Sequence, residues 1–146
     1  MLRRVVIVGQ NLARASQTTQ AFLGTRSGAV LAGWLHAAGL RESLATTIKM
    51  VNVVNRKTRN NRPLKAREIR RALPALADAI EGADLVVTLG NQAAKAVLMC
   101  AHLVRREMPP ATALQHPSGR NRNLNDPAVR AAQPEAIRRA CAFLGI

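Results

Sequence analysis

Three short polar segments of the sequence carry side chains that could do chemistry. They are Gly9-Gln10-Asn11, the single residue Asn52 inside an apolar run, and the stretch from His116 to Asn121. The amide of Asn52 offers a donor and an acceptor side by side, and inside an apolar strand it needs hydrogen-bond partners. The imidazole of His116 can donate a hydrogen bond near neutral pH. The Pro-Ser-Gly turn, with a His and an Arg beside it, suits close approach to a phosphate backbone.

The elements that must position these segments alternate between strands and helices. Apolar periodicity predicts strands over residues 3–8, 46–54, 84–89 and 111–114, and helices over residues 27–39, 64–81, from 90 onward and 128–144. Such alternation is typical of a parallel sheet with helices on both faces. We therefore expect a single α/β domain over residues 1–146, a three-layer α/β/α sandwich around a central, mainly parallel four-stranded sheet.

The three polar segments all lie at the ends of predicted strands. Gln10-Asn11 ends the first strand, residues 52–55 end the second, and His116-Pro117-Ser118 follows the fourth. In open α/β sheets, ligands bind beyond the carboxyl ends of the strands. The pattern therefore predicts that the three segments converge on one rim of the sheet.

The chain carries an extreme positive charge. Its net charge is +14 over 146 residues, which attracts polyanions but says little about the fold. A tract with Glu68 as its only acid contains Arg56, Lys57, Arg59, Arg62, Lys65, Arg67, Arg70 and Arg71. A solvated loop and helix face is one interpretation, but we expect nucleic acid as the partner because the whole chain shares the bias. A membrane surface fits less well, since the tract lacks the large apolar side chains that an interfacial helix inserts.

Composition narrows the class of protein further. No apolar run approaches the roughly 18 residues of a membrane span. The run Val5-Val6-Ile7-Val8 is too short for a signal peptide and is better explained as a buried strand, so we expect a cytoplasmic protein. Cys100 and Cys141 lack metal-ligand spacing, so we interpret them as buried thiols and expect neither a metal nor a cofactor. Because the high charge opposes self-association, we expect a monomer.

In this order and at these spacings, the three segments resemble the uracil-DNA glycosylase superfamily. Its members carry a Gly-rich water-activating motif after the first strand, a base-reading Asn on a later strand and a His-Pro-Ser loop near the C-terminus. The similarity to the thermostable bacterial branch extends to residues 22–28, to Asn52-Val53-Val54 with Arg62-Pro63, and to residues 89–96. The resemblance covers most of the chain, from about residue 5 to about residue 125.

The chain departs from each branch of that superfamily. It lacks the four cysteines that hold an iron–sulfur cluster in the thermostable branch, and it has Gln10 where that branch has Glu. Asn11 is similar to the single-strand-selective and mismatch-specific branches, which usually continue with Pro where this chain has Leu12. The uracil-specific branch uses a Tyr to block the thymine methyl, and this chain contains no Tyr. We therefore hypothesise a cluster-free enzyme with a roomier pocket that admits 5-substituted uracils.

The resemblance implies a role for each matching residue. Asn11 would hold the attacking water, and His116 would donate a hydrogen bond to the departing base. Arg120 would take the place of the base that is flipped out of the stack. The base would be contacted by Gly9, Gln10, Phe22, which stacks on the ring, and Asn52, which reads its edge. DNA would be bound by Arg56, Lys57, Arg59, Arg62, Ser118, Gly119, Arg120, Asn121 and Arg122.

Simpler interpretations stay open at this point. Asn11 could form an Asx turn, Asn52 could cap a neighbouring loop, Phe22 could belong to the core, and Arg120 could be a plain surface charge. The chain could also retain the superfamily fold as a DNA-binding protein without catalysis, because its first motif has no carboxylate. A different nucleotide-processing α/β enzyme is a third interpretation, although such an enzyme would not need the basic tract.

Overall fold

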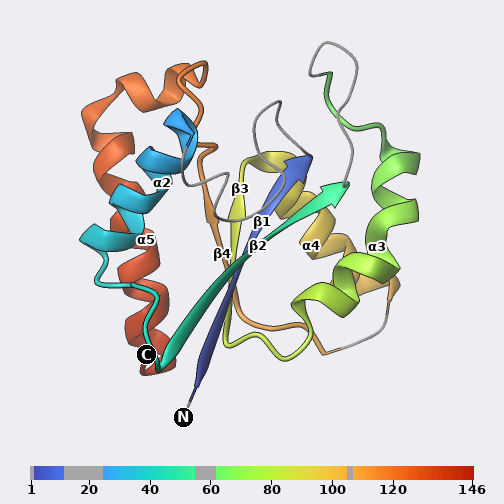
Figure 1. The fold of residues 1–146 in the computed structure, drawn as a ribbon. Coiled ribbons are helices and arrows are strands. Elements are labelled where there is room, and N and C mark those ends of the chain that lie inside the picture. The colour runs from blue at the N-terminus through green and yellow to red at the C-terminus, as the bar shows by residue number, and fades with distance from the viewer. Residues whose placement is uncertain (1, 12–24, 55–61, 105–106) are drawn as a thin grey trace.

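A parallel sheet forms the centre of the protein (Figure 1). The computed structural model describes residues 2–11, 25–54, 62–104 and 107–146. In these residues a four-stranded sheet has the order β2–β1–β3–β4, and its neighbouring strands all run parallel. The strands are β1 (Arg3–Asn11), β2 (Thr46–Val54), β3 (Leu85–Leu89) and β4 (Ala111–Leu114).

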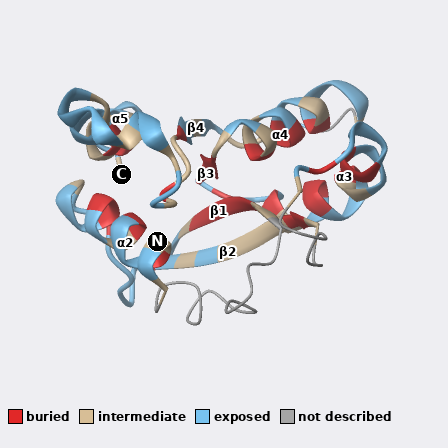
Figure 2. Ribbon diagram, turned by 90° about the horizontal axis from the view of Figure 1, so that it is seen from above, coloured by how far each residue is buried: buried red, intermediate tan, exposed pale blue. Residues whose placement is uncertain are grey.

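Helices cover both faces of this sheet. On one face lie α2 (Arg26–Ala37) and α5 (Pro127–Leu144), and on the other lie α3 (Ala66–Ile80) and α4 (Asn91–Leu103). Figure 2 shows these two layers on opposite sides of the strands. A 3-10 turn, η2 (Arg122–Asn125), leads into α5. The arrangement confirms the α/β class predicted from the alternation of strands and helices.

Two apolar clusters follow from the alternation of side chains along the central strands. Val6 and Val8 of β1 point into a cluster with α3 and α4, whereas Val5 and Ile7 point into a second cluster with α2 and α5. Every residue of β3 is buried. A strand buried on both faces appears in sequence as a continuous apolar run, which explains why β1 and β3 could be recognised without alternation.

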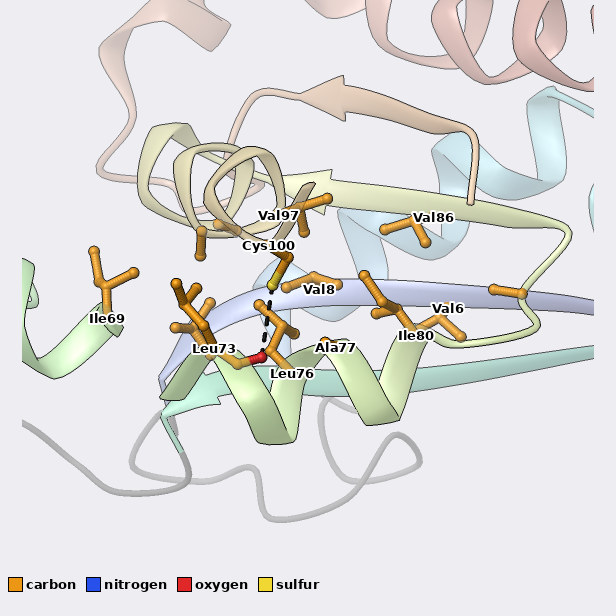
Figure 3. Packing of buried hydrophobic residues seen from close by; sticks show 14 of the residues in the cluster. Val6, Val8, Ile69, Leu73, Leu76, Ala77, Ile80, Val86, Val97 and Cys100 are labelled. Atoms are coloured by element: carbon orange, nitrogen blue, oxygen red, sulfur yellow. Dashed lines mark hydrogen bonds between the residues drawn. The ribbon is translucent and has the colours of Figure 1, made fainter. Parts of the chain in front are cut away.

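Both cysteines are free thiols buried in these clusters, as their interpretation from sequence required. Figure 3 shows Cys100 of α4 among the side chains of α3, where its Sγ donates to the carbonyl of Leu73 at 3.7 Å. Burial raises the pKa of the Cys100 thiol and also that of Cys141, where the charge of Arg3 opposes the effect. Both thiols therefore pack as small core side chains.

Several observed boundaries differ from the expected ones: α2 spans Arg26–Ala37 instead of residues 27–39, and β1 and α3 differ as well. β1 continues beyond its apolar run because Gly9 and Asn11 pair with Asn52 and Val54 of β2. α3 begins at Ala66, and the residue before it, Lys65, is an extended N-cap. Within the described ranges, every helix is too short or too polar to cross a bilayer.

Candidate functional site

All of the strands direct their carboxyl ends to one rim of the sheet, because their pairings are parallel. This rim carries Gln10 and Asn11 at the end of β1 and Asn52 near the end of β2. Gly90 follows β3 there, and His116 follows β4. The structure thus brings to one edge the polar segments that lie far apart in the sequence.

Gly9 makes room for the amide of Asn52. The two residues lie opposite each other in the β1–β2 pair. The Oδ1 atom of Asn52 lies 2.7 Å from the point where a Cβ of residue 9 would stand, and Cε of Met50 lies 2.9 Å from that point. A side chain at position 9 would displace Asn52, because packed groups resist added volume. Asn52 therefore leans over β1, with its carboxamide above a residue that has no side chain.

His116 is held as a neutral imidazole with a defined tautomer. Its Nδ1 accepts a hydrogen bond of 3.1 Å from the backbone N–H of Ser118. Burial lowers the pKa of His116 below its usual 6.5, because desolvation disfavours the charged ring. A neutral ring that accepts at Nδ1 carries its proton on Nε2. His116 therefore presents an N–H donor at the rim at neutral pH.

Gly90 allows the turn after β3 to pack against this histidine. Its φ of +84° lies in the region that favours glycine. A Cβ at position 90 would stand 3.4 Å from Cβ of His116 and 3.8 Å from its Cδ2. The backbone N–H of Gly90 also donates to the carbonyl of Leu114 at 2.9 Å, which extends the β3–β4 pairing to the rim. The close approach of this turn helps to desolvate the imidazole.

Asn52 and His116 approach the centre of the rim from its two sides. Asn52 starts on β2 and leans over Gly9 of β1, whereas His116 follows β4 and packs against Gly90 at the end of β3. β1 and β3 are neighbours in the sheet. Neighbouring strands lie about 5 Å apart, so one planar base placed over these two strand ends could contact both groups.

A network of side-chain amides fixes the loop that carries His116. Nδ2 of Asn121 donates to the carbonyl of His116 at 3.0 Å and to Oε1 of Gln115 at 3.1 Å. Oδ1 of Asn121 accepts from the N–H of Asn123 at 3.1 Å. Gln133, buried in α5, accepts from the N–H of Gln115 at 2.8 Å. The Asn121 amide is thus engaged within the loop, where it orients the residues around His116.

The sequence interpretation had no role for Gln115 and Gln133. A role for Gln133 could have been predicted, because a Gln on the apolar face of a predicted helix requires a hydrogen-bond partner. It has two such bonds, since its Nε2 also donates to the carbonyl of Val129 at 2.8 Å. Gln115 gave no such signal, because its partners come from residues that only the folded loop brings near.

The tip of the same loop is open to solvent. Oγ of Ser118 accepts from the N–H of Arg120 at 3.2 Å, which leaves its hydroxyl proton available to a ligand. Apart from its two chain neighbours, no described residue has an atom within 4 Å of the point where a Cβ of Gly119 would stand. Arg120 and Arg122 are exposed. The tip therefore offers a hydroxyl, an uncovered backbone and two cations beside His116.

Arg62 is engaged in the protein itself. Its Nη1 and Nη2 donate to the two carboxylate oxygens of Glu68 at 2.7 and 3.3 Å. Glu68 is buried, and its Oε1 also accepts from the N–H of Lys65 at 3.0 Å. Such a bidentate pair holds the guanidinium in a fixed position. Arg62 therefore secures the start of α3, a role that the basic composition of the tract did not indicate.

Several predicted site residues lie outside the described residues. These are Phe22, Arg56, Lys57 and Arg59. Asn11 is the last residue of β1, and its backbone pairs with Val54, but its side chain is not described. The roles assigned to these five side chains remain predictions from the sequence.

A comparison with models of protein families gives a match over most of the chain. A family model described as "Uracil DNA glycosylase superfamily" matches residues 2–143. A search of the curated proteins finds no match. The matched range includes every strand described above, the whole rim and every helix except the last residue of α5.

Proposed function

Since this chain belongs to the uracil DNA glycosylase superfamily, we propose that it is a monofunctional DNA glycosylase. In this proposal it hydrolyses the N-glycosidic bond of uracil in DNA, and of 5-substituted uracils, after the base has been flipped out of the stack. The observation that carries the proposal is the neutral imidazole of His116, which is fixed at Nδ1 and offers Nε2–H at the same rim as Asn52.

The reaction requires a donor of this kind. When the C1′–N1 bond breaks, negative charge develops on the departing base and positive charge on the sugar. The Nε2–H of His116 donates to the base oxygen that receives the negative charge, and a fixed donor stabilises such charge without reorganising. The oxygen of a water molecule held by Asn11 bonds to C1′, and a proton from that water neutralises the base anion.

Asn52 and the residues around it select the base. The amide of Asn52 pairs with the edge of uracil, and a base with the opposite donor and acceptor pattern would leave buried polar groups unpaired. Gly9 keeps the amide in place, Gln10 follows Gly9 at the end of β1, and Phe22 stacks on the ring. The absence of Tyr from the chain supports a pocket that tolerates a substituent at C5.

The DNA backbone follows the basic residues around the rim. Ser118 and Gly119 contact the phosphates that flank the flipped nucleotide, and Arg120 fills the vacated stack, because a guanidinium both stacks and neutralises phosphate. Asn121 supports this loop, and Arg122 adds charge beside it. Arg56, Lys57 and Arg59 also bind the backbone in this proposal, while Arg62 holds the start of α3.

A strand-cleavage assay tests the proposal. The protein is incubated with single-stranded DNA that contains one uracil or one 5-hydroxymethyluracil, and alkali then cuts any abasic site. We expect cutting with both bases. The variants His116→Ala and Asn11→Ala should lower the rate of base release while DNA binding persists. Loss of one donor to a developing anion typically lowers the rate of an enzyme by about 10²–10³-fold. His102→Ala removes an exposed histidine of α4 and should keep the wild-type rate.

The same assay distinguishes the proposed glycosylase from a protein that binds DNA without catalysis. The first motif offers amides at Gln10 and Asn11 in place of a carboxylate, which favours a protein that binds uracil-containing DNA without cleaving it. Binding by the wild type without any alkali-labile site would support that alternative. A wild-type rate in His116→Ala would remove His116 from the proposed step.

A further inference from the structure

The first half of α3 carries a stripe of exposed cations that the proposed base site does not use. Arg67, Arg70 and Arg71 are exposed, and their spacing of three and four residues places them side by side on a helix. Ile69 and Leu73 of the same turns are buried against the sheet. The stripe therefore lies on the part of α3 that faces away from the core.

Among the described residues, no carboxylate is paired with this stripe. Glu68, the acid nearest to it in the sequence, is turned inward and bound to Arg62. Within the described part of the chain, no ion pair joins Arg67, Arg70 or Arg71 to a carboxylate. Cations placed together without counter-charges repel one another, and a bound polyanion relieves that repulsion.

The start of α3 lies at the same rim as the proposed base site. β2 ends there at Val54, and α3 begins after the connection that follows. The segment before α3 is fixed to the start of α4, because Gln92 accepts from the N–H of Leu64 at 2.9 Å and donates to its carbonyl at 3.1 Å. The stripe therefore runs down α3 from the rim and holds a defined position relative to Asn52.

The chemistry of this helix favours a nucleic acid over a membrane. The large hydrophobic residues exposed in the described residues are Leu2, Val30, Leu44, Leu98, Leu103 and Phe143. None of them belongs to α3, so this helix has no apolar side chains to insert into a bilayer. A row of guanidiniums without apolar neighbours matches a row of phosphates.

We propose that Arg67, Arg70 and Arg71 form a phosphate-binding track on α3 that holds the DNA on one side of the flipped nucleotide, outside the base site. This proposal rests on the proposed function, because it assumes DNA at the rim. The track contacts only phosphates, so it is independent of base sequence and acts on affinity rather than on the chemical step.

The test compares two triple variants that lose the same charge. The first is Arg67→Gln, Arg70→Gln and Arg71→Gln. The matched control is Arg3→Gln, Arg41→Gln and Arg139→Gln, which removes exposed arginines away from the rim. Thermal unfolding and the fluorescence of the single Trp, Trp34, confirm that both variants are folded. Binding to single-stranded uracil DNA is measured over a range of salt, with the DNA extended on either side of the uracil.

We expect only the α3 variant to change DNA binding. Each lost phosphate contact lowers the slope of log affinity against log salt by about 0.7 on single strands, so the α3 variant should lose about 2 from the slope. The wild type should bind more tightly when the DNA is extended on the side of the uracil that reaches α3. The α3 variant should not show this gain in affinity. Its rate of base release at saturating protein should match the wild type. The control should keep both the slope and the gain.

Other outcomes overturn the track. Equal losses in the two variants would mean that only total charge matters, and an unchanged slope in the α3 variant would mean that the stripe does not touch DNA. In both cases base release by the wild type would leave the proposed function intact. Failure of the wild type to bind DNA at all would refute both proposals together.

Discussion

The partly buried imidazole of His116 makes the stability of the protein depend on pH. Its pKa in the folded chain is lowered below 6.5 by desolvation, whereas in the unfolded chain it keeps its usual value. Above 6.5 the ring is neutral in both states and has no effect. As the pH falls from 6.5 toward the folded pKa, only the unfolded state gains the proton, so stability is lost in that window.

Urea unfolding at pH 7.5, 6.5 and 5.5 measures this effect. The midpoint of the wild type should fall more steeply below pH 6.5 than that of His116→Gln, which cannot gain the proton. His102→Gln removes an exposed histidine instead and should follow the wild type. If the urea midpoints of the wild type and His116→Gln change with pH in the same way, the pKa of His116 is the same in the folded and unfolded protein.

Single residues differ in how far the sequence indicates their role. Asn52 and His116 could be singled out because each is a polar residue beside an apolar strand, where an amide or imidazole needs a partner. The DNA-binding role of Arg62 follows from the basic tract and the family resemblance, and that of Asn121 from the resemblance of its loop. The structure shows both side chains engaged within the protein, and these contacts depend on loops that no local pattern describes.

At the level of elements, the strands could be located well, but the carboxyl end of β1 could not. β2 and β4 begin and end at the residues that their apolar patterns predicted. β1 extends to Asn11 because β2 continues beside it, and pairing with a distant strand leaves no mark in the local sequence. The same register places Asn52 opposite Gly9, so the extension of β1 also builds part of the candidate site.

The variant Gly9→Ala tests this contact between β1 and β2. The new Cβ would meet Oδ1 of Asn52 at 2.7 Å and Cε of Met50 at 2.9 Å. Overpacking of this kind typically costs about 1–3 kcal/mol, and displacement of Asn52 should lower base excision by more than the loss of stability explains. Gly119→Ala is the matched control, since its Cβ would meet no described residue within 4 Å other than its chain neighbours. If Gly9→Ala releases bases at the wild-type rate, the position of the Asn52 amide does not matter to the reaction.

For the whole molecule, charge rather than packing sets the response to solution conditions. The two apolar clusters lie on opposite faces of one sheet and stabilise the fold by burial, which is insensitive to salt at moderate concentrations. The net charge of +14 lowers the stability of the folded state, because folding brings the cations closer together. The free protein is therefore under electrostatic strain that DNA or dissolved salt can relieve.

Salt should consequently raise the stability of the free protein while it weakens DNA binding. Screening shortens the reach of each charge from about 30 Å at 0.01 M to about 8 Å at 0.15 M salt, so repulsion between distant cations fades over this range. The thermal midpoint should rise between these two concentrations of sodium chloride, and it should rise less in the variant that lacks Arg67, Arg70 and Arg71. Affinity for DNA should fall over the same range, because salt removes the entropy gained from counterion release. A midpoint that stays constant or falls with salt would mean that the cations are already balanced by contacts within the fold.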